Sequence, residues 1–253
     1  RVIDRDTMHR ALDDCLRPDL FTDYAPNGLQ VEGRSAIRRL VSGVTACQAL
    51  LDAAIDREAD AILVHHGYFW KGEDQRVQGM KKQRLQSLLR HDINLFAYHL
   101  PLDAHPELGN NVQLARLLGL SVEGGMEPDN PRSLGNIGRL DAPVTARTFA
   151  RRVEELLGRS VLHVGEPDDE IATLAWCTGA AQGFIGRARE LGVDAYISGE
   201  ISEPTTHEAR ETGVHYFACG HHATERYGVQ AVGQWLAEAY GIEHIHIDID
   251  NPA

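Results

Sequence analysis

The feature that most constrains the fold of this chain is a regular alternation of short apolar runs with segments of helical periodicity. The apolar runs 37–45, 60–66 and 93–99 predict strands, and the segments 46–58 and 81–90 between them predict helices. Strands that alternate with helices in this way pair in parallel within one layer. The first half of the chain therefore predicts an α/β fold with a parallel sheet.

The second half of the chain repeats this pattern. Residues 44–66 align without a gap with residues 178–200, which pairs identical residues such as Gln48 and Gln182. Each of the two segments is typical of a helix followed by a strand. Since order, spacing and pattern agree, we predict two similar, duplicated α/β domains.

A stretch rich in Gly, Pro and Asp, residues 121–138, separates the two halves. Such composition is typical of a domain boundary. We therefore predict an N-terminal α/β domain over residues 1–126 and a C-terminal α/β domain over residues 127–253, whose last segment could pack back on the first domain. Just before the boundary, residues 109–120 predict a helix that Asn110 caps.

Composition narrows the class of protein. A net charge of −12, without a run rich in Lys and Arg, disfavours direct binding of nucleic acid. The four cysteines form no Cys-x-x-Cys pair, which argues against a zinc ribbon and favours a reducing compartment. No signal-peptide run and no apolar stretch of about 20 residues is present, so we expect a cytoplasmic protein without a membrane span.

Histidines and carboxylates follow three of the apolar runs, at the points where the predicted strands end. They are His65 with His66, His99 with Asp103, and His221 with Glu225. Ligands of parallel α/β sheets gather beyond the carboxyl ends of the strands. Three such clusters at equivalent places in the topology favour a functional site over isolated surface histidines.

The residue types indicate a metal centre. Imidazole nitrogens with carboxylate oxygens suit zinc, manganese, iron or nickel. His221 and Glu225 lie four residues apart, so they face the same way on a helical turn, and His99 and Asp103 have the same spacing. Because these donors exceed what one tetrahedral ion needs, we predict two divalent metal ions per chain with a bridging carboxylate.

Other motifs are better explained by structure. His105 precedes a proline in a turn, and His222 faces away from His221 if a helix begins there, so neither is a predicted ligand. The turn 176–184 could hold an anion on its backbone N–H groups. It lacks a Walker lysine and a full Gly-x-Gly-x-x-Gly, so tight packing is the favoured interpretation.

Seven motifs in order carry a resemblance to a known family. They are "PNGLQVEG" (26–33), "VTA" (44–46), "VHHGYFWKG" (64–72), "HLPLDAH" (99–105), "LGNIGRL" (134–140), "SGE" (198–200) and "CGHHATE" (219–225). With these motifs the chain resembles the Nif-three-like family, and most closely its YbgI-type branch of dinuclear metal centre proteins, known as GTP cyclohydrolase I type 2 homologues. Many relatives have proline where this chain has Gly67, and threonine where it has Leu100.

The resemblance implies two similar α/β domains with a two-metal site in the cleft between them, in a toroidal homohexamer. It also implies a ligand set and a bridging role for Glu225. The implied ligands are His65, His66, Asp103, His221 and Glu225. His99 takes a place near the site, where it could orient a ligand or carry a proton.

Two metals that share a water and a carboxylate favour hydrolysis, because they lower the pKa of the water. Our first hypothesis is a dinuclear metal-dependent hydrolase that acts on a small molecule, with a nucleotide as candidate. The resemblance narrows it to a GTP cyclohydrolase type of activity that uses a metal-activated water. Phosphoester or amide hydrolysis fits the residues equally well. The alternative is a non-enzymatic hexameric metal-binding or scaffold protein.

Overall fold

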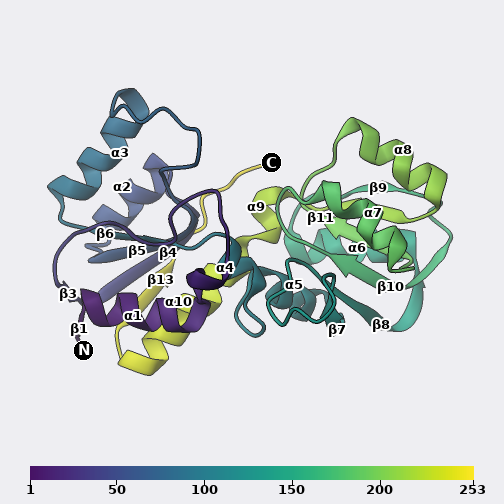
Figure 1. The fold of residues 1–253 in the computed structure, drawn as a ribbon, viewed down its shortest axis with the longest axis horizontal. Coiled ribbons are helices and arrows are strands. Elements are labelled where there is room, and N and C mark those ends of the chain that lie inside the picture. The colour runs from purple at the N-terminus through teal and green to yellow at the C-terminus, as the bar shows by residue number, and fades with distance from the viewer. The chain divides into compact units, whose positions relative to one another are not determined.

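The computed structural model describes residues 1–253, which form two compact α/β units (Figure 1). Unit 1 contains Arg1–Leu102 and Gly228–Asp250, and unit 2 contains Asp103–Tyr227 and Asn251–Ala253. The chain passes from one unit to the other inside α4 (Leu100–Ala104). The stretch 121–138, rich in Gly and Pro, therefore lies inside unit 2, and the segment near the C-terminus returns to unit 1.

Unit 1 is built around a five-stranded sheet with the strand order β13-β4-β5-β6-β2. Its elements are β1 (Ile3–Asp4), α1 (Arg5–Leu16), η1 (Pro18–Leu20), β2 (Gly28–Val31), β3 (Ala36–Ile37), β4 (Arg39–Thr45), α2 (Gln48–Asp56), β5 (Ala61–His66), α3 (Gly79–Arg90), β6 (Asn94–Ala97), most of α10 (Arg226–Tyr240) and β13 (Glu243–His246). Strands β13, β4, β5 and β6 are parallel, and β2 is antiparallel to β6.

Helices cover both faces of this sheet, which explains why its strands are apolar almost throughout. Helices α2 and α3 lie on one face, and α1 and α10 lie on the other (Figure 1). On the first face, Ile62 and Val64 of β5 pack with Leu50 of α2 and Leu88 of α3. The helix and strand pattern read from residues 37–99 thus forms the predicted parallel layer.

Unit 2 is built around a six-stranded sheet with the strand order β7-β8-β10-β11-β12-β9. Its elements are α5 (Asn110–Leu118), β7 (Ser121–Gly125), β8 (Asn136–Thr145), α6 (Ala146–Leu157), β9 (Leu162–Val164), β10 (Glu170–Trp176), η2 (Gln182–Phe184), α7 (Ile185–Glu190), β11 (Ala195–Ser198), α8 (Glu203–Thr212), β12 (His215–Ala218) and α9 (His221–Thr224). Strands β10, β11 and β12 are parallel, whereas β7, β8 and β9 join antiparallel.

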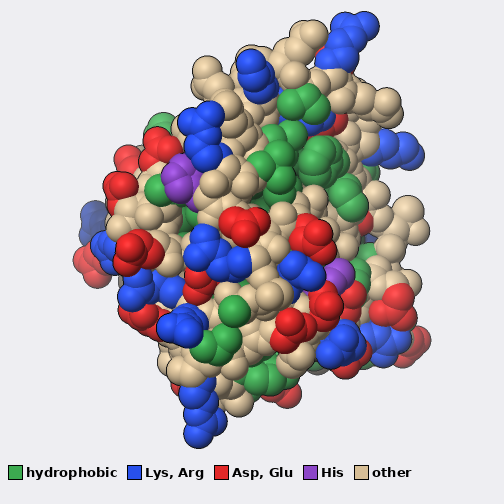
Figure 2. Space-filling model, turned by 90° about the vertical axis from the view of Figure 1, so that its left-hand side faces the viewer, with side chains coloured by type: hydrophobic (Ala, Val, Ile, Leu, Met, Phe, Trp, Pro, Cys, Tyr) green, Lys and Arg blue, Asp and Glu red, His purple; other side chains and the backbone are tan.

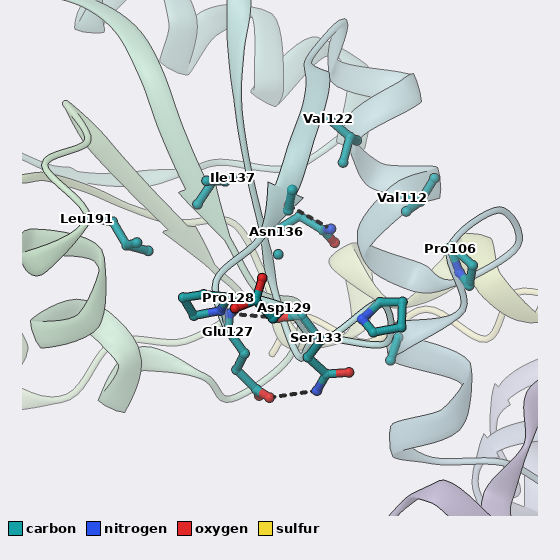
Figure 3. Close-up of a pocket in the computed structure, with 15 residues that line it drawn as sticks. Pro106, Val112, Val122, Glu127, Pro128, Asp129, Ser133, Asn136, Ile137 and Leu191 are labelled. Carbon is teal, nitrogen blue, oxygen red and sulfur yellow. Dashed lines mark hydrogen bonds between the residues drawn. The ribbon is translucent and has the colours of Figure 1, made fainter.

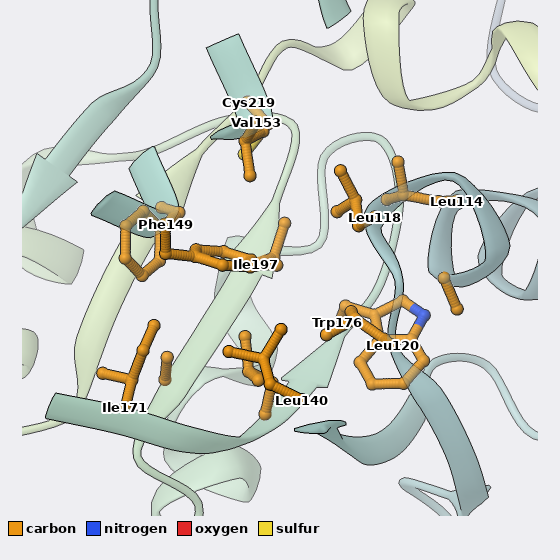
Figure 4. Close-up of a cluster of buried hydrophobic side chains, with 14 of the residues drawn as sticks. Leu114, Leu118, Leu120, Leu140, Phe149, Val153, Ile171, Trp176, Ile197 and Cys219 are labelled. Carbon is orange, nitrogen blue, oxygen red and sulfur yellow. The ribbon is translucent and has the colours of Figure 1, made fainter. Parts of the chain in front are cut away.

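The central strands of unit 2 place alternate side chains in two separate cores. Trp176, Ile197 and Phe217 point into the core that α5 and α6 cover (Figure 4). Tyr196 and Tyr216 point to the opposite face, where they pack with side chains of α7 and α8. Because successive residues of a strand face opposite sides, both faces are apolar and both need helices.

The two units share one topological plan. In unit 1 the order is β4-α2-β5-α3-β6, and in unit 2 it is β10-α7-β11-α8-β12. In each unit the third strand of this series also pairs with an antiparallel strand, β2 or β9. The predicted fold class, a duplicated α/β architecture, is confirmed at this level. His66 in unit 1 and Glu200 in unit 2 occupy equivalent positions at strand ends. His66 lies two residues beyond Val64, the last residue of β5 that pairs with β6. Glu200 lies two residues beyond Ser198, the last residue of β11 that pairs with β12.

The surface carries charges of both signs. Figure 2 shows Lys, Arg, Asp and Glu side chains interspersed over the face that it draws, instead of one basic field. None of the helices combines the length and the apolar character that crossing a bilayer requires.

The core of unit 2 depends on aromatic packing, which gives a first prediction. Phe149 of α6 is fully buried and meets Phe217 edge to face, with ring centroids 5.2 Å apart. We expect Phe149→Ala to lower the free energy of unfolding of unit 2 by about 3–5 kcal/mol in denaturant titrations, because it leaves a cavity. The control is Leu156→Ala on the same helix, where the side chain is exposed, with an expected loss below about 1 kcal/mol. Equal losses would contradict this packing.

Strands β9 and β12 also hold a pair of histidines, of which His215 is buried and His163 is partly buried. His163 Nε2 and His215 Nδ1 are 2.9 Å apart, and His215 Nε2 lies 3.0 Å from Asp169 Oδ2. His163 also stacks on Phe217. Burial and the neighbouring His215 lower the pKa of His163 from its usual 6.5 to about 4, against the smaller opposing effect of Asp169.

This lowered pKa predicts a pH dependence of stability. The unfolded chain takes up a proton at His163 near pH 6.5, whereas the folded chain resists it until about pH 4. The stabilisation is therefore complete above pH 6.5 and is lost progressively as the pH falls toward 4. We expect the thermal unfolding midpoint to fall over this window, and to fall less steeply in His163→Gln. An identical decline in the variant would show that His163 does not contribute.

Candidate functional site

The histidine doublet, His65 and His66, ends strand β5. Each of the two rings contacts a residue at or just beyond the end of a different neighbouring strand. His65 Nδ1 lies 2.9 Å from the backbone oxygen of Tyr98, just after β6, and His66 Nδ1 lies 3.0 Å from Thr45 Oγ1, at the end of β4. The two ring centroids are 4.6 Å apart although successive side chains of a strand diverge. A carbonyl oxygen only accepts, so the proton of His65 is on Nδ1 and its Nε2 presents a lone pair.

His99 joins the doublet from the end of β6. Its ring centroid lies 5.2 Å from that of His65 and 5.9 Å from that of His66. One ring nitrogen from each of the three histidines can be chosen so that the three nitrogen atoms lie within 4.8 Å of one another. The predicted gathering of histidines beyond the strand ends is thus present in unit 1. Three imidazole nitrogens this close suit a divalent ion of the zinc, manganese, iron or nickel type.

A carboxylate that the sequence pattern did not single out orients His99. Asp23 Oδ1 lies 2.7 Å from His99 Nδ1, and Asp23 Oδ2 accepts hydrogen bonds from Leu100 N and Asn27 Nδ2. Asn27 in turn accepts from the backbone N–H of His99 at 2.7 Å. Burial would raise the pKa of Asp23, but the hydrogen bond and charge of His99, with Asn27 and Tyr24 N–H, lower it to about 2.

Gly67 follows the doublet, and the structure gives a reason for a glycine at this position. A Cβ at this position would lie 2.2 Å from Gln30 Oε1 and 2.6 Å from Ala97 Cβ. The Gln30 amide occupies this space and holds the turn, because it accepts from Tyr68 N at 2.8 Å and donates to Tyr68 O at 3.0 Å. The turn after His66 is therefore held in place by Gln30.

In unit 2, His221 begins α9 and lies between two carboxylates. His221 Nε2 is 2.7 Å from Glu225 Oε1, and His221 Nδ1 is 2.5 Å from Glu200 Oε2. Burial alone would lower the pKa of His221, but the hydrogen bonds and charges of Glu225 and Glu200 outweigh it and raise the pKa to about 9. The predicted proximity of His221 and Glu225 is present, and Glu200 is an addition.

Glu225 is buried, with 2% of its surface exposed, and the turn after β10 makes room for it. Gly179 has φ +78°, and a Cβ there would lie 3.0 Å from Glu225 Oε2. The N–H groups of this turn bond within the protein: Thr178 N, Gly179 N and Ala181 N donate to Asn111 Oδ1, Thr224 Oγ1 and Ser198 Oγ. The turn therefore serves close packing against Glu225, as the sequence favoured.

Asp103 is also buried in unit 2, where two donors hold its carboxylate. Asn110 Nδ2 and Thr178 Oγ1 lie 2.9 Å and 3.1 Å from Asp103 Oδ1. The prediction that Asn110 caps a helix is wrong: Gly109 is the N-cap of α5, without a side-chain hydrogen bond, and Asn110 is the first helical residue. Its amide is turned to Asp103 because that buried carboxylate needs a donor.

The histidines assigned to a structural role have local partners. His105 Nδ1 accepts from the backbone N–H groups of Glu107 and Leu108, which is a turn contact. His222 is buried in unit 2, and its backbone N–H donates to the Ala253 carbonyl. Neither residue belongs to a group of converging metal-binding atoms.

Asp23 and Glu200 are the two acidic residues at these clusters that the sequence patterns did not assign. Glu200 aligns with His66 in the internal repeat, so the repeat could have indicated it. Asp23 is 76 residues from His99 and belongs to a turn-rich segment without periodicity, so only the folded chain brings it to the cluster.

Unit 2 also contains a cavity of about 620 Å³ that none of the candidate ligands lines. Figure 3 shows its walls, which include Val112 of α5, Val122 of β7 and Ile137 of β8. The loop that closes it is held together internally, since Asn130 Nδ2 donates to Glu127 Oε2 at 2.8 Å. The cavity is mainly apolar, and it is separate from the histidine and carboxylate clusters.

Comparisons with known proteins agree with the motifs. The model of the family Duf34/NIF3 (NGG1p interacting factor 3) matches residues 3–252. The chain belongs to this family. A protein of Pseudomonas aeruginosa named GTP cyclohydrolase 1 type 2 homolog is 61% identical over 233 residues, which is 91% of each chain. A protein of the same name from Yersinia pestis is 58% identical over 247 residues, 97% of this chain and 98% of that one.

Solved structures of the NIF3 family have the same fold. The protein ybgI, of unknown function, matches with a TM-score of 0.95 at 50% sequence identity, over 99% of this chain and 100% of that chain. The protein TTHA1606 from Thermus thermophilus matches with a TM-score of 0.88 at 34% identity, again over 99% and 100%. The resemblance drawn from the motifs, to the Nif-three-like family and its YbgI-type branch, is confirmed.

The close packing of Gln30 and Ala97 against Gly67 gives a prediction about metal binding by the histidine cluster. Gly67→Ala places a Cβ against Gln30 and Ala97, so we expect a lower thermal unfolding midpoint and weaker binding of zinc, measured by isothermal titration. The matched control is Gly183→Ala, where a Cβ meets nothing within 4 Å and both properties should stay unchanged. Equal behaviour of the two variants would contradict the role of Gln30 in holding the turn.

Proposed function

We propose that this NIF3-family chain is a dinuclear metal-dependent hydrolase, with ligands His65, His66, Asp103, His221 and Glu225. The observation that carries the proposal is the packing of the two imidazoles of the doublet, His65 and His66, whose Nδ1 atoms bond outward to a carbonyl and a hydroxyl. Such outward bonds are how proteins orient histidines that bind metal.

The donor types fit a pair of divalent ions. Unit 1 offers imidazole nitrogens, and unit 2 offers the carboxylates of Asp103 and Glu225 with the imidazole of His221. In this proposal Glu225 would be the bridging carboxylate. A pair of bound ions lowers the pKa of a water molecule and polarises the bond to be cleaved.

The His99–Asp23 pair supplies proton transfer in this proposal. Asp23 holds Nδ1 of His99, so a proton is exchanged at Nε2, on the side of the ring toward the histidine doublet. The Asp23 carboxylate stabilises the imidazolium that forms when His99 accepts a proton. Asn27 and Leu100 N–H keep Asp23 in this place.

The substrate class comes from the relatives. Since relatives at 51–61% identity are named GTP cyclohydrolase 1 type 2 homolog, we propose hydrolytic opening of the guanine ring of GTP as the reaction to test first. The homohexamer, which the sequence motifs imply through their family resemblance, is the proposed assembly. Phosphoesters and amides are the substrates to test next, because activated water also attacks these groups.

Metal content is the first test. We expect purified protein to carry about two divalent ions per chain by elemental analysis, and Glu225→Ala to carry one or none, because the variant lacks the bridging ligand. The control is Glu203→Ala, an exposed carboxylate at the start of α8, which should keep both ions. A content below one ion per chain in the unaltered protein would refute the dinuclear centre.

Activity is the second test. We expect release of formate from GTP by the metal-loaded protein, and a fall of about 100-fold or more in kcat for His99→Ala at unchanged metal content, because a positioned proton carrier contributes about 10²–10⁴-fold. Turnover of only a phosphoester or amide would keep the hydrolase and correct the substrate. If no compound of these classes is turned over by protein that holds two metals, a metal-binding scaffold replaces the hydrolase.

A further inference from the structure

Two aromatic side chains flank the histidine cluster of unit 1. The ring centroid of Trp70 lies 5.0 Å from that of His99, with the planes at 89°, and that of Tyr24 lies 6.2 Å from His99, at 70°. Trp70 also lies 6.0 Å from His66. Tyr24 has 62% of its surface exposed, and Trp70 is partly exposed. Both rings are thus accessible to solvent, beside a cluster in which His65 is buried and His66 and His99 are partly exposed.

These rings belong to two loops that the backbone fastens together. Lys71 N donates to Tyr24 O at 2.6 Å, which joins the loop before β2 to the loop after β5. Trp70 Nε1 donates to Gly67 O at 3.2 Å, and the Trp70 N–H donates to the Glu73 carboxylate. Each ring is therefore attached to a loop whose backbone is fixed, which lowers the entropy that binding a ligand would cost.

Acidic and basic side chains both lie around this pair, and Lys71 directly follows Trp70 and is exposed, so charge does not single out an anionic group as its partner. Glu73 and Asp74 lie in the loop that carries Trp70, and Lys81 is already engaged with Glu73 Oε2 at 2.9 Å and with Asp74 O at 3.0 Å. On the other loop, Asp23 carries a negative charge beside Tyr24. The faces of tyrosine and tryptophan attract flat π systems, and such stacking tolerates different bases.

We propose that Tyr24 and Trp70 form the binding wall for a planar heteroaromatic ring of the substrate, next to His99. The inference rests on the proposed function, because it places the reacting ring at the metal-binding histidines. It adds two specificity-determining residues and a substrate class: a heterocycle recognised by its ring, with contacts of these two residues that do not depend on phosphate groups.

Binding of small probes tests the wall. Isothermal titration of the metal-loaded protein uses guanosine, adenosine and pterin as compounds with a planar aromatic ring, and ribose 5-phosphate as a phosphate without an aromatic ring. We expect the rings to bind and ribose 5-phosphate to bind at least about 10-fold more weakly, since it offers no face for stacking. Tyr24→Leu and Trp70→Leu should each weaken binding of the rings by about 10-fold, as loss of a stacking partner does.

Matched variants separate stacking from structural damage. Tyr24→Phe and Trp70→Phe keep an aromatic face and should bind the rings within about threefold of the unaltered protein. Phe184→Leu removes an aromatic residue of unit 2 that is 40% exposed and should change nothing. The inference is refuted if the leucine variants bind the aromatic compounds as tightly as the unaltered protein does. It is also refuted if the unaltered protein binds none of these compounds.

The outcome is distinguishable from failure of the proposed function. Ring binding that depends on Tyr24 and Trp70, in protein that holds fewer than one metal per chain or turns over none of the tested compounds, supports the wall and refutes the hydrolase. Two bound metals with ring binding that is indifferent to both substitutions refutes the wall and leaves the hydrolase standing. Metal content is measured on every variant, so that a lost metal is not taken for a lost stacking contact.

Discussion

The direction of the imidazole protons is the constraint on which this candidate site depends. His65 and His66 can bind cations only if a lone pair of each ring faces inward, and His99 can carry a proton there only if its ring is oriented in the same way. Each Nδ1 therefore needs a partner on the outside. The Tyr98 carbonyl, the Thr45 hydroxyl and the Asp23 carboxylate are those partners. Backbone topology supplies the first two, because β5 lies between β4 and β6 and each histidine of the doublet reaches a different neighbour. The parallel sheet thus positions the two histidines and also supplies the hydrogen-bond partners that orient their rings.

The duplicated plan places a second set of polar side chains at the equivalent strand ends of unit 2. There the pattern is carboxylate-rich, with Glu200 at the position that His66 occupies in unit 1, and with Glu225 beside His221. Without a metal ion, the two carboxylates favour a proton on His221, as its pKa of about 9 indicates, and a bound divalent ion would take the place of that proton. One α/β unit thus presents imidazole nitrogens, and the other presents carboxylate oxygens together with the imidazole of His221. Such division of donor types suits a centre for divalent ions.

Much of this could be read from the sequence, because it depends on local pattern. Apolar runs and helical periodicity predicted the strands and helices of both units, and the position of histidines after strands predicted which side chains gather in each unit. Contacts over long separations could not be predicted in this way. Asp23 reaches His99 from an irregular segment, Gln30 fills the space that Gly67 leaves, and Asn110 turns from a capping role to bind Asp103. Each depends on tertiary packing, which no local pattern encodes.

The central proposal is that the chain binds a pair of divalent ions. Anomalous diffraction from crystals grown with manganese or zinc tests it most directly, because it locates each ion and identifies its ligands. The account predicts two peaks a few ångströms apart, bound by His65 and His66 on one side and by Asp103, His221 and Glu225 on the other. A single peak, or two peaks bound to other side chains, would contradict it.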